Sequence, residues 1–338
     1  MSANPRTQSH GADAPKSIAD ISAFGYNVEP ADAVTADLPL PRAFYVIGAP
    51  RCGTTSVSDT LKRNPHISFS VPKETHFLQR DRGEQSEESW RRTYVARYHP
   101  RLNRAHQAMG DGSVSYIYSP DAIRRALDFD PRARFVAVLR NPVEMLQSFH
   151  LRLLYLLDED VADFATAWAL QESRARGENI PRYCRDPRML QYGEIGRFSE
   201  HLERVFAVAG RDRCLVLLFE DLVQEPRATY KRILDFIGVD DDGQTKFRRK
   251  RQSLTFKSWW LQRLLMNPPD WVLRRIQAMN VKQIPRLKRW RKKMKRINNR
   301  PAEHPPLSNE TQAMLRRYFA PDIERLAVLL DRDLSRWL

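Results

Sequence analysis

The chain has 338 residues, more than the roughly 150 of a typical domain, so its length would fit one large domain or two smaller ones. Hydrophobic residues make up 42% of the sequence, which excludes a wholly disordered chain, and the longest apolar run, Cys214 to Phe219, is far too short to span a bilayer. The formal net charge of +15 is concentrated in residues 246–300, where 19 basic residues and one acidic residue give +18, so the other 283 residues sum to −3.

The N-terminal part of the chain differs from the rest. Residues 1–40 are rich in Ala, Ser, Asp and Pro, have no sustained helical or strand period and contain no apolar signal core, so we expect a flexible segment there. We expect residues 41–338 to form a single domain. Three cysteines, at positions 52, 184 and 214, support neither a disulfide framework nor a zinc site, and a reducing, cytoplasmic setting fits them best.

Short apolar runs then alternate with longer helical patterns. The runs at 43–48, 135–139 and 215–219 are too short for helices and are predicted to be buried strands, and helices are predicted at 55–63, 142–157, 161–174, 189–209 and 227–237. Such alternation is typical of a parallel sheet covered by helices. We therefore predict an α/β fold in three layers, with a central parallel sheet flanked by helices.

The loop after the first predicted strand has an anion-binding pattern. Residues 48–56 read GAPRCGTTS between a strand and a helix, a P-loop-like setting in which backbone N–H groups and a helix N-terminus can hold phosphate or sulfate. A nucleoside triphosphatase loop would read GxxxxGK[ST]. Gly48 and Gly53 have that spacing, but Thr54 stands where the lysine is required and the basic residue is Arg51. A nucleotide kinase is therefore disfavoured, and an ordinary glycine turn is the other alternative.

Arg140 follows the second of these predicted strands. Asn141 can cap a helix and Pro142 suits its first position, so Arg140 is predicted to lie where a strand ends and a helix begins. Ligands of open parallel sheets bind at this carboxyl edge. We expect the loop at 48–56 and the loop at Arg140 to converge on one crevice.

Two segments on these loops resemble signatures of the sulfotransferases that use 3′-phosphoadenosine-5′-phosphosulfate. PRCGTT at 50–55 is similar to PKSGTT or PRSGTT, and RNPVEMLQS at 140–148 is similar to RNPxxxxxS. The resemblance implies that Arg140 and Ser148 recognise the 3′-phosphate. It also implies that the 5′-phosphosulfate is surrounded by Arg51, Cys52, Gly53, Thr54, Thr55 and Ser56. Among these, Arg51 would be a catalytic residue that acts through its charge. Sulfuryl transfer in this family needs no metal.

A third segment, VPKETHF at 71–77, resembles the KExHFF element of the carbohydrate branch, which includes the heparan sulfate enzymes. The resemblance implies that Glu74 is the catalytic base, with Lys73 and His76 beside it. A positioned carboxylate would take the proton of an attacking hydroxyl. The alternative for Glu74 is a surface carboxylate that is paired with Lys73. His76 could instead be the base, as in the cytosolic branch of the family, or it could be a structural residue.

Further resemblance extends over about residues 43–243 and 301–338. GDGSVSY at 110–116 resembles GExSPxY, with Asp111 where Glu is usual and Val114 where Pro is usual. LVLLFED at 215–221 also resembles a Walker B strand, whose carboxylate could hold Mg²⁺. Without the loop lysine, we interpret Glu220 as structural.

Residues 246–300 fit the family least well and are interpreted as a basic, Trp-rich helical insertion. They hold four of the seven Trp residues, and 259–266 and 271–279 have a helical period. Basic amphipathic helices with Trp favour anionic membrane surfaces, so we expect attachment to the inner face of the membrane. A solvated basic face, a docking surface for an acidic polysaccharide and a nucleic-acid patch are the alternatives. Arg300 is expected to close over the donor.

These patterns together indicate a sulfotransferase that moves a sulfuryl group from 3′-phosphoadenosine-5′-phosphosulfate to a hydroxyl of a carbohydrate or glycolipid, with no metal and no nucleic-acid partner. A P-loop kinase and a non-catalytic nucleic-acid binder are the two alternatives from other classes. A kinase would need Mg²⁺ and bind ATP. A nucleic-acid binder would show a steep dependence on salt.

Overall fold

The computed structural model describes residues 39–247, 253–277, 284–302 and 306–338. The flexible segment predicted for residues 1–40 lies outside the described residues except for its last two. Among the described residues, no helix is both long enough and apolar enough to cross a membrane.

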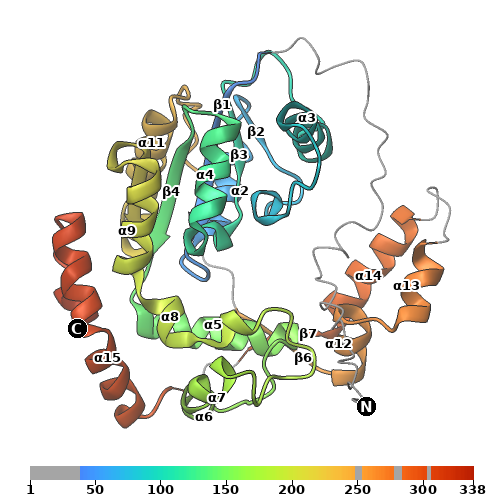
Figure 1. The fold of residues 1–338 in the computed structure, drawn as a ribbon, viewed down its shortest axis with the longest axis vertical. Helices are drawn as coiled ribbons and strands as arrows, with labels where there is room; N and C mark the ends of the chain where they lie inside the picture. Colours follow the sequence, from blue (N-terminus) through green and yellow to red (C-terminus); the bar gives the residue numbers. More distant parts are fainter. Residues whose placement is uncertain (1–38, 248–252, 278–283, 303–305) are drawn as a thin grey trace, which may run out of the picture.

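Five parallel strands form the centre of the molecule (Figure 1). They are β1 (Arg42–Gly48), β2 (Ile67–Phe69), β3 (Ala108–Asp111), β4 (Arg134–Leu139) and β5 (Cys214–Leu218), in the order β2-β3-β1-β4-β5. Nearly every residue of β1, β4 and β5 is buried, because helices cover both faces of the sheet. The predicted parallel sheet is confirmed.

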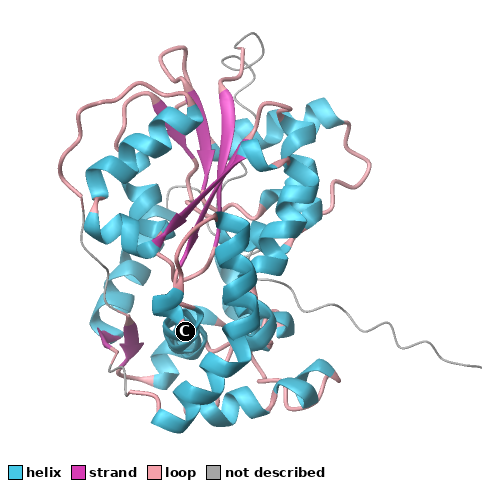
Figure 2. Ribbon diagram, turned by 90° about the vertical axis from the view of Figure 1, so that its left-hand side faces the viewer, coloured by secondary structure: helices cyan, strands magenta, loops and turns pink. Residues whose placement is uncertain are grey.

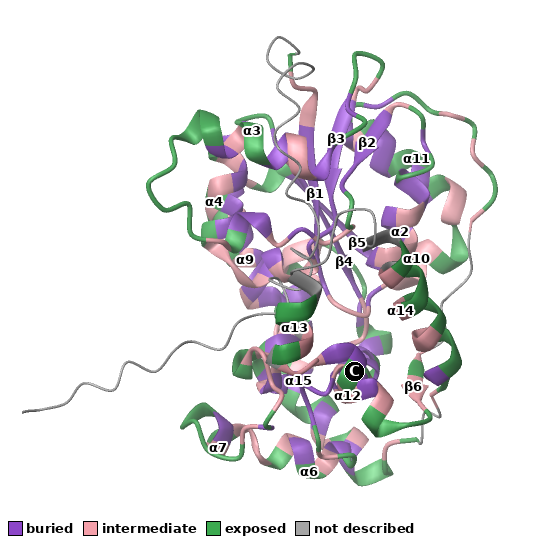
Figure 3. Cartoon of the chain, turned by 90° about the vertical axis from the view of Figure 1, so that its right-hand side faces the viewer, coloured by how far each residue is buried: buried purple, intermediate pink, exposed green. Residues whose placement is uncertain are grey.

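Helices lie on both sides of this sheet (Figure 2). Outside residues 246–300 the α-helices are α2 (Thr54–Leu61), α3 (Glu87–Tyr98), α4 (Pro120–Phe129), α5 (Pro142–Leu156), α6 (Phe164–Ala169), α7 (Gln171–Ala175), α8 (Tyr192–Gly196), α9 (Phe198–Ala209), α10 (Phe219–Gln224), α11 (Pro226–Ile237) and α15 (Asn309–Leu330), and α5 to α8 lie beyond one end of the sheet in Figure 1. The three-layer α/β fold is therefore as predicted. The strands and the inner sides of the helices form one buried core (Figure 3).

Strand order places the two predicted ligand loops side by side. From β1 the chain runs to β2 and β3 on one side of β1, and then crosses to β4 and β5 on the other. The order of strands thus reverses between β1 and β4. In open α/β sheets this reversal opens a crevice at the carboxyl ends of the strands, which is where ligands bind.

Two helices that the periodicity predicts as continuous are broken. Residues 161–174 form α6 and α7, and α6 starts only at Phe164 because Asp163 caps its Thr166 N–H at 2.8 Å. Residues 189–209 contain α8 and α9, separated at Arg197. Gly196 lies so close to Phe319 that a Cβ there would come within 2.6 Å of the ring. Packing of α15 against this point overrides the helical period.

The insertion forms a helical hairpin on a two-stranded base. β6 (Leu254–Phe256) pairs antiparallel with β7 (Asn299–Pro301), and between them lie α12 (Trp259–Met266), α13 (Asp270–Gln277) and α14 (Ile284–Asn298). The helix predicted at 259–266 is confirmed, and that predicted at 271–279 is helical up to Gln277, beyond which it lies outside the described residues. Gln262 donates to the Tyr155 carbonyl at 2.6 Å and the Tyr155 hydroxyl donates to Asn299 at 2.9 Å, so the insertion is attached to α5.

Candidate active site

The loop between β1 and α2 leaves free donors at a helix N-terminus. Gly53 caps α2 with a φ of +94°, a conformation that favours glycine, and having no side chain it satisfies none of the first-turn N–H groups. Thr54 and Thr55 are the first helical residues. A helix N-terminus with free N–H groups attracts anions. The predicted phosphate or sulfate site therefore has the required backbone geometry.

Two other residues of the predicted donor loop differ in their surroundings. Cys52 is fully buried, and this burial raises the pKa of its thiol, so the side chain cannot reach a ligand and only its backbone could. Ser56 is half-buried and borders a small hollow. Thr60, Leu222 and Phe247 share in lining that hollow.

Arg51 joins the two predicted signatures. Its Nε donates to the Ser148 hydroxyl on α5 at 2.9 Å, and its Nη2 donates to the Ser253 hydroxyl of the insertion at 2.8 Å. Burial, and then repulsion from Arg152 and Arg140, lowers the pKa of the Arg51 guanidinium. Both of its hydrogen-bond partners are neutral. A half-buried cation that has no carboxylate partner among the described residues is a favourable place for an anion.

Arg140 lies at the end of β4, as predicted, and faces the same crevice. Its guanidinium carbon is 4.9 Å from the centre of the Phe219 ring, and its Nε donates to Glu144 at 2.9 Å. Phe219 also lies under the first loop, because a Cβ on Gly53 would be 3.0 Å from the ring. The loops after β1 and β4 therefore meet over Phe219, and the structure brings Arg51, Gly53, Arg140 and Ser148 together.

Arg300 is the predicted residue that the structure does not bring into this group. It lies on β7 opposite Thr255, with an exposed side chain. Within the described part of the chain it shares no hydrogen bond or ion pair with Arg51, Arg140 or Ser148. Ser253 makes the contact from the insertion instead, and no sequence pattern singles it out.

Glu74 is held by the two neighbours that the sequence places beside it. Lys73 Nζ lies 3.0 Å from Glu74 Oε1, and His76 Nε2 lies 3.6 Å from Glu74 Oε2. Partial burial alone would raise the pKa of Glu74, but the His76 contact and the charge and hydrogen bond of Lys73 lower it to about 2. The carboxylate is therefore ionised at neutral pH.

His76 is oriented toward Glu74 by an unusual backbone. Its φ is +49°, in the left-handed region that non-glycine residues rarely adopt. Its Nδ1 lies 2.8 Å from the Ser115 hydroxyl, which leaves Nε2 on the side of Glu74. Such backbone conformations persist where the surroundings hold them in place, often at functional sites.

A buried carboxylate holds the loop that carries Glu74. Asp111, at the end of β3, is fully buried and accepts from the Thr75 hydroxyl at 2.5 Å and from the Ser113 hydroxyl at 2.7 Å. The Ser113 oxygen in turn accepts from the N–H groups of Thr75 and His76, each at 3.0 Å. Asp111 is therefore a positioning residue, a role that the sequence signals only through the GDGSVSY segment.

Two further cations, one that interacts with Glu74 and one that interacts with the first, were not predicted as site residues. Arg152 is four residues after Ser148 on α5, and desolvation lowers its pKa, while Glu74 is among the charges that oppose this shift. Lys295, on α14, has its pKa lowered to about 8 by burial and by Arg291 and Arg152. No carboxylate of the described ranges forms an ion pair with Arg152 or Lys295.

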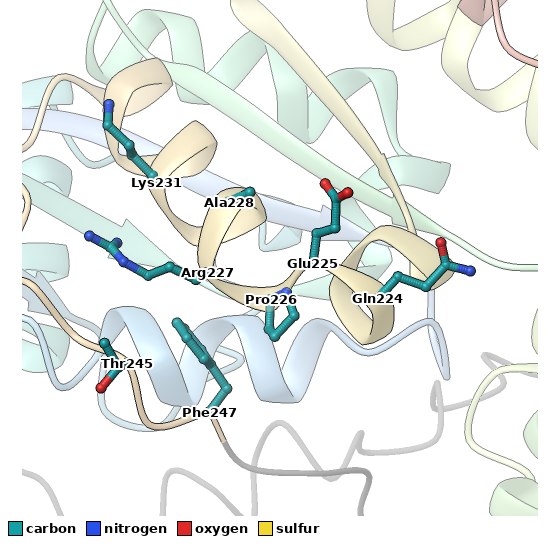
Figure 4. Close-up of a pocket in the computed structure, with 8 residues that line it drawn as sticks. All are labelled: Gln224, Glu225, Pro226, Arg227, Ala228, Lys231, Thr245 and Phe247. Carbon is teal, nitrogen blue, oxygen red and sulfur yellow. The ribbon is translucent and has the colours of Figure 1, made fainter.

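Other groups lie outside this arrangement. Glu220, the residue that a Walker B strand would offer to Mg²⁺, accepts a hydrogen bond from the Trp337 indole at 3.0 Å. No cluster of three or more His, Cys, Asp or Glu side chains suited to a metal ion occurs among the residues that the structure covers. A surface hollow of about 520 Å³ lies beside the N-terminus of α11 (Figure 4). None of the predicted site residues lines it.

Comparison with known proteins shows what the chain as a whole is similar to. Residues 41–264 match the model of the sulfotransferase domain family. The chain is 22% identical over 353 residues to carbohydrate sulfotransferase 15 of Mus musculus, covering 87% of this chain and 54% of that protein. It is 25% identical over 235 residues to bifunctional heparan sulfate N-deacetylase/N-sulfotransferase 4 of Mus musculus, covering 67% of this chain and 25% of that protein. The chain thus spans about half the length of the first relative and a quarter of the second.

A solved structure shows the same fold. The crystal structure of a sulfotransferase from Alicyclobacillus acidocaldarius superposes with a TM-score of 0.59 and 23% sequence identity. The match covers 89% of this chain and 99% of that one. At this level of identity the likeness extends to the fold alone.

Proposed function

The chain belongs to the sulfotransferase domain family, and from this we propose that it transfers a sulfuryl group from 3′-phosphoadenosine-5′-phosphosulfate to a hydroxyl of a carbohydrate, free or as the headgroup of a glycolipid. The observation that carries the proposal is the 2.9 Å hydrogen bond between Arg51 and Ser148, which joins the loop after β1 to helix α5, the two segments that would bind the two ends of the donor. The curated relatives support a carbohydrate acceptor. The donor supplies the activated sulfuryl group.

Arg51 and the first turn of α2 would bind the 5′ end of the donor. The guanidinium and the N–H groups of Thr54 and Thr55 provide positive charge where the leaving phosphate oxygen gains negative charge. The two neutral partners of Arg51 fit this role, because no carboxylate must be displaced. Arginine keeps its proton, so the contribution is electrostatic.

Arg140 and Ser148 would bind the 3′-phosphate. Arg140, whose side chain is 12% exposed, is paired with Glu144, whose side chain is 59% exposed and can return to solvent when the pair separates. A phosphate can bind the guanidinium through two parallel hydrogen bonds, which are stronger. Exchange of Glu144 for the phosphate is therefore favourable, and it distinguishes this donor from nucleotides without a 3′-phosphate.

Glu74 would accept the proton of the attacking hydroxyl. With a pKa of about 2 it is ionised but a poor proton acceptor while Lys73 and His76 are bound to it. When the acceptor hydroxyl takes the place of the Lys73 ammonium at Oε1, the carboxylate loses a stabilising cation and becomes more basic. His76, held by Ser115, would orient the other oxygen, so we assign it positioning and Glu74 the base.

Arg152 and Lys295 favour an acidic saccharide as acceptor. Neither forms an ion pair with a carboxylate in the described ranges, and the charge of Arg152 interacts with that of Glu74 across a longer distance. We expect Lys295→Met to raise KM for a carboxylated saccharide without changing KM for a neutral one. Lys292→Met, an exposed residue of the same helix, is the matched control and should change neither.

Calorimetry with adenosine 3′,5′-bisphosphate and with ATP tests the proposed donor. We expect the bisphosphate to bind more tightly than ATP, and Arg140→Ala to remove this preference. Tighter binding of ATP in the presence of Mg²⁺ would instead indicate a kinase. Sulfate transfer to a desulfated heparan polysaccharide and to a galactose-bearing glycolipid then separates the two acceptor classes.

The base assignment has its own test. We expect Glu74→Gln to abolish turnover and to leave the affinity for adenosine 3′,5′-bisphosphate nearly unchanged, because Glu74 is not among the donor contacts. His76→Gln should retain measurable turnover. Loss of donor binding in Glu74→Gln equal to its loss of turnover would contradict the assignment.

A further inference from the structure

We propose that the insertion, described here as residues 253–277 and 284–302, binds the surface of an anionic lipid bilayer. Its four Trp residues are all exposed: Trp259 43%, Trp260 70%, Trp271 65% and Trp290 48%. Outside the insertion, Trp90 and Trp337 are buried at 5% and 4%, and Trp168 is packed against the core. Exposure of Trp is therefore confined to the most basic part of the chain.

Helix α12 has one buried face and one apolar exposed face. Gln262, Leu265 and Met266 are buried against the body of the protein. Trp260 and Leu264, four residues apart and so on one side of the helix, are both exposed. The apolar outer side is thus not needed to hold the helix in place.

The same combination of Trp and basic residues recurs on the next two helices. On α13, exposed Trp271 is followed at helical spacing by exposed Arg274 and Arg275. Figure 3 shows exposed residues of α13 and α14 in green.

On α14, the positions at i, i+4, i+7 and i+11 form one exposed stripe that alternates basic and apolar side chains. They are Arg286, Trp290, Lys293 and Ile297.

This mixture suits the depth of lipid headgroups. Indole rings prefer the membrane–water interface, and long basic side chains reach from there to the phosphates. Arg263 makes cation–π contacts with two of these Trp residues: its guanidinium carbon lies 5.9 Å and 5.7 Å from the ring centres of Trp259 and Trp260. Cation and aromatic faces thus share one surface, as in interfacial helices.

Charge complementarity selects an anionic bilayer. Residues 253–277 and 284–302 carry thirteen basic residues and one acidic residue. Near an anionic membrane, each basic residue strengthens binding by about 1 kcal/mol, or about fivefold.

Nucleic acid or an acidic polysaccharide would satisfy the same charge, and nucleic-acid bases could stack on Trp. Neither would account for the exposed aliphatic side chains of Leu254, Leu264 and Ile297, which a bilayer interface would cover.

The position of the insertion relates this surface to the active site. Figure 1 shows α12, α13 and α14 together in orange, beside one end of the molecule and away from the parallel sheet. The strand that opens the insertion follows Ser253, which binds Arg51. A bilayer bound by the insertion would therefore lie near the catalytic crevice. The proposal concerns binding only and does not depend on the identity of the donor or acceptor.

Co-sedimentation of the full chain with vesicles tests the proposal. We expect binding to equimolar phosphatidylcholine and phosphatidylserine, weaker binding in high salt, and little binding to phosphatidylcholine alone. Tryptophan fluorescence of the unmodified protein should shift to the blue with the first vesicles, a readout that needs no variant. Removal of two charges in Arg274→Gln/Arg275→Gln should weaken binding about thirtyfold, from about 1 kcal/mol per charge.

The Trp residues have their own variants and controls. The triple change Trp260→Ala, Trp271→Ala and Trp290→Ala should weaken vesicle binding at least tenfold, and each single change should do so partly. Val328→Ala removes an exposed apolar side chain of α15 and should have no effect. Arg101→Gln/Arg104→Gln removes two exposed charges elsewhere and should also have no effect.

Two results would overturn the proposal. One is failure of the unmodified protein to bind either kind of vesicle or to shift its fluorescence. The other is a triple Trp variant that binds vesicles as well as the unmodified protein, together with equal binding to heparin or single-stranded DNA, which would make the surface a general polyanion site.

Discussion

Replacement of Asp111 by Asn tests how the base is positioned. Oδ1 of Asp111 accepts from the backbone and hydroxyl of Ser113, and Oδ2 accepts from the hydroxyls of Thr75, Tyr94 and Tyr116. An amide nitrogen at the place of Oδ2 would leave three hydroxyl donors without their acceptor. Each hydrogen bond to a charged group contributes about 1.5–3 kcal/mol, and removal of the buried charge offsets several kcal/mol of this loss. We expect the free energy of unfolding to fall by about 2–4 kcal/mol.

The same change should affect catalysis more than donor binding. Thr75 and Ser113 hold the loop on either side of Glu74, so kcat should fall at least tenfold while the affinity for adenosine 3′,5′-bisphosphate is retained. Urea unfolding and a steady-state sulfate-transfer assay measure the two effects. Tyr94→Phe removes one donor to Asp111 from α3 and should cost about 1 kcal/mol without changing kcat. An Asp111→Asn protein with unchanged urea midpoint and unchanged kcat would refute this reasoning.

Three further outcomes are expected. Because the pKa of Glu74 in the unliganded protein is about 2, kcat/KM should be independent of pH on the acid side down to about pH 4, whereas a histidine base would give a fall near about pH 6.5. Ser148→Ala should weaken calorimetric binding of adenosine 3′,5′-bisphosphate about tenfold and leave that of adenosine 5′-phosphate unchanged. Arg174→Met leaves the buried Glu159 carboxylate unpaired and should lower the urea-derived stability by about 3–5 kcal/mol, whereas Arg176→Met, at an exposed pair, should cost under about 1 kcal/mol.

Sequence patterns were sufficient for the central strands but not for the edge of the sheet. β1, β4 and β5 are continuous apolar runs, which is what burial on both faces requires. β2 and β3 have only three and four residues, too few to show a period. β3 also contains Gly110, where a Cβ would come within 2.4 Å of the Phe44 ring, a requirement that only the packed structure reveals.

The site likewise contains residues that the sequence could predict and residues that it could not. Arg51 and Arg140 were predicted because each is adjacent in sequence to a turn or helix-start signal at a strand end. Ser253 binds Arg51 across a separation of 202 residues, and no local pattern marks it. Lys295 is one of 19 basic residues in its segment, so only its burial distinguishes it.

Helix α5 has a consequence for engineering. The middle of the helix carries Ser148 against Arg51, and its C-terminal end carries Tyr155 against Gln262 and Asn299 of the insertion. A segment of other specificity that replaced the whole insertion, β6 and β7 included, would therefore perturb nucleotide affinity unless it kept the anchors at 253, 262 and 299. Chimeras that retain these three residues are the variants in which acceptor choice can be exchanged on an intact catalytic framework.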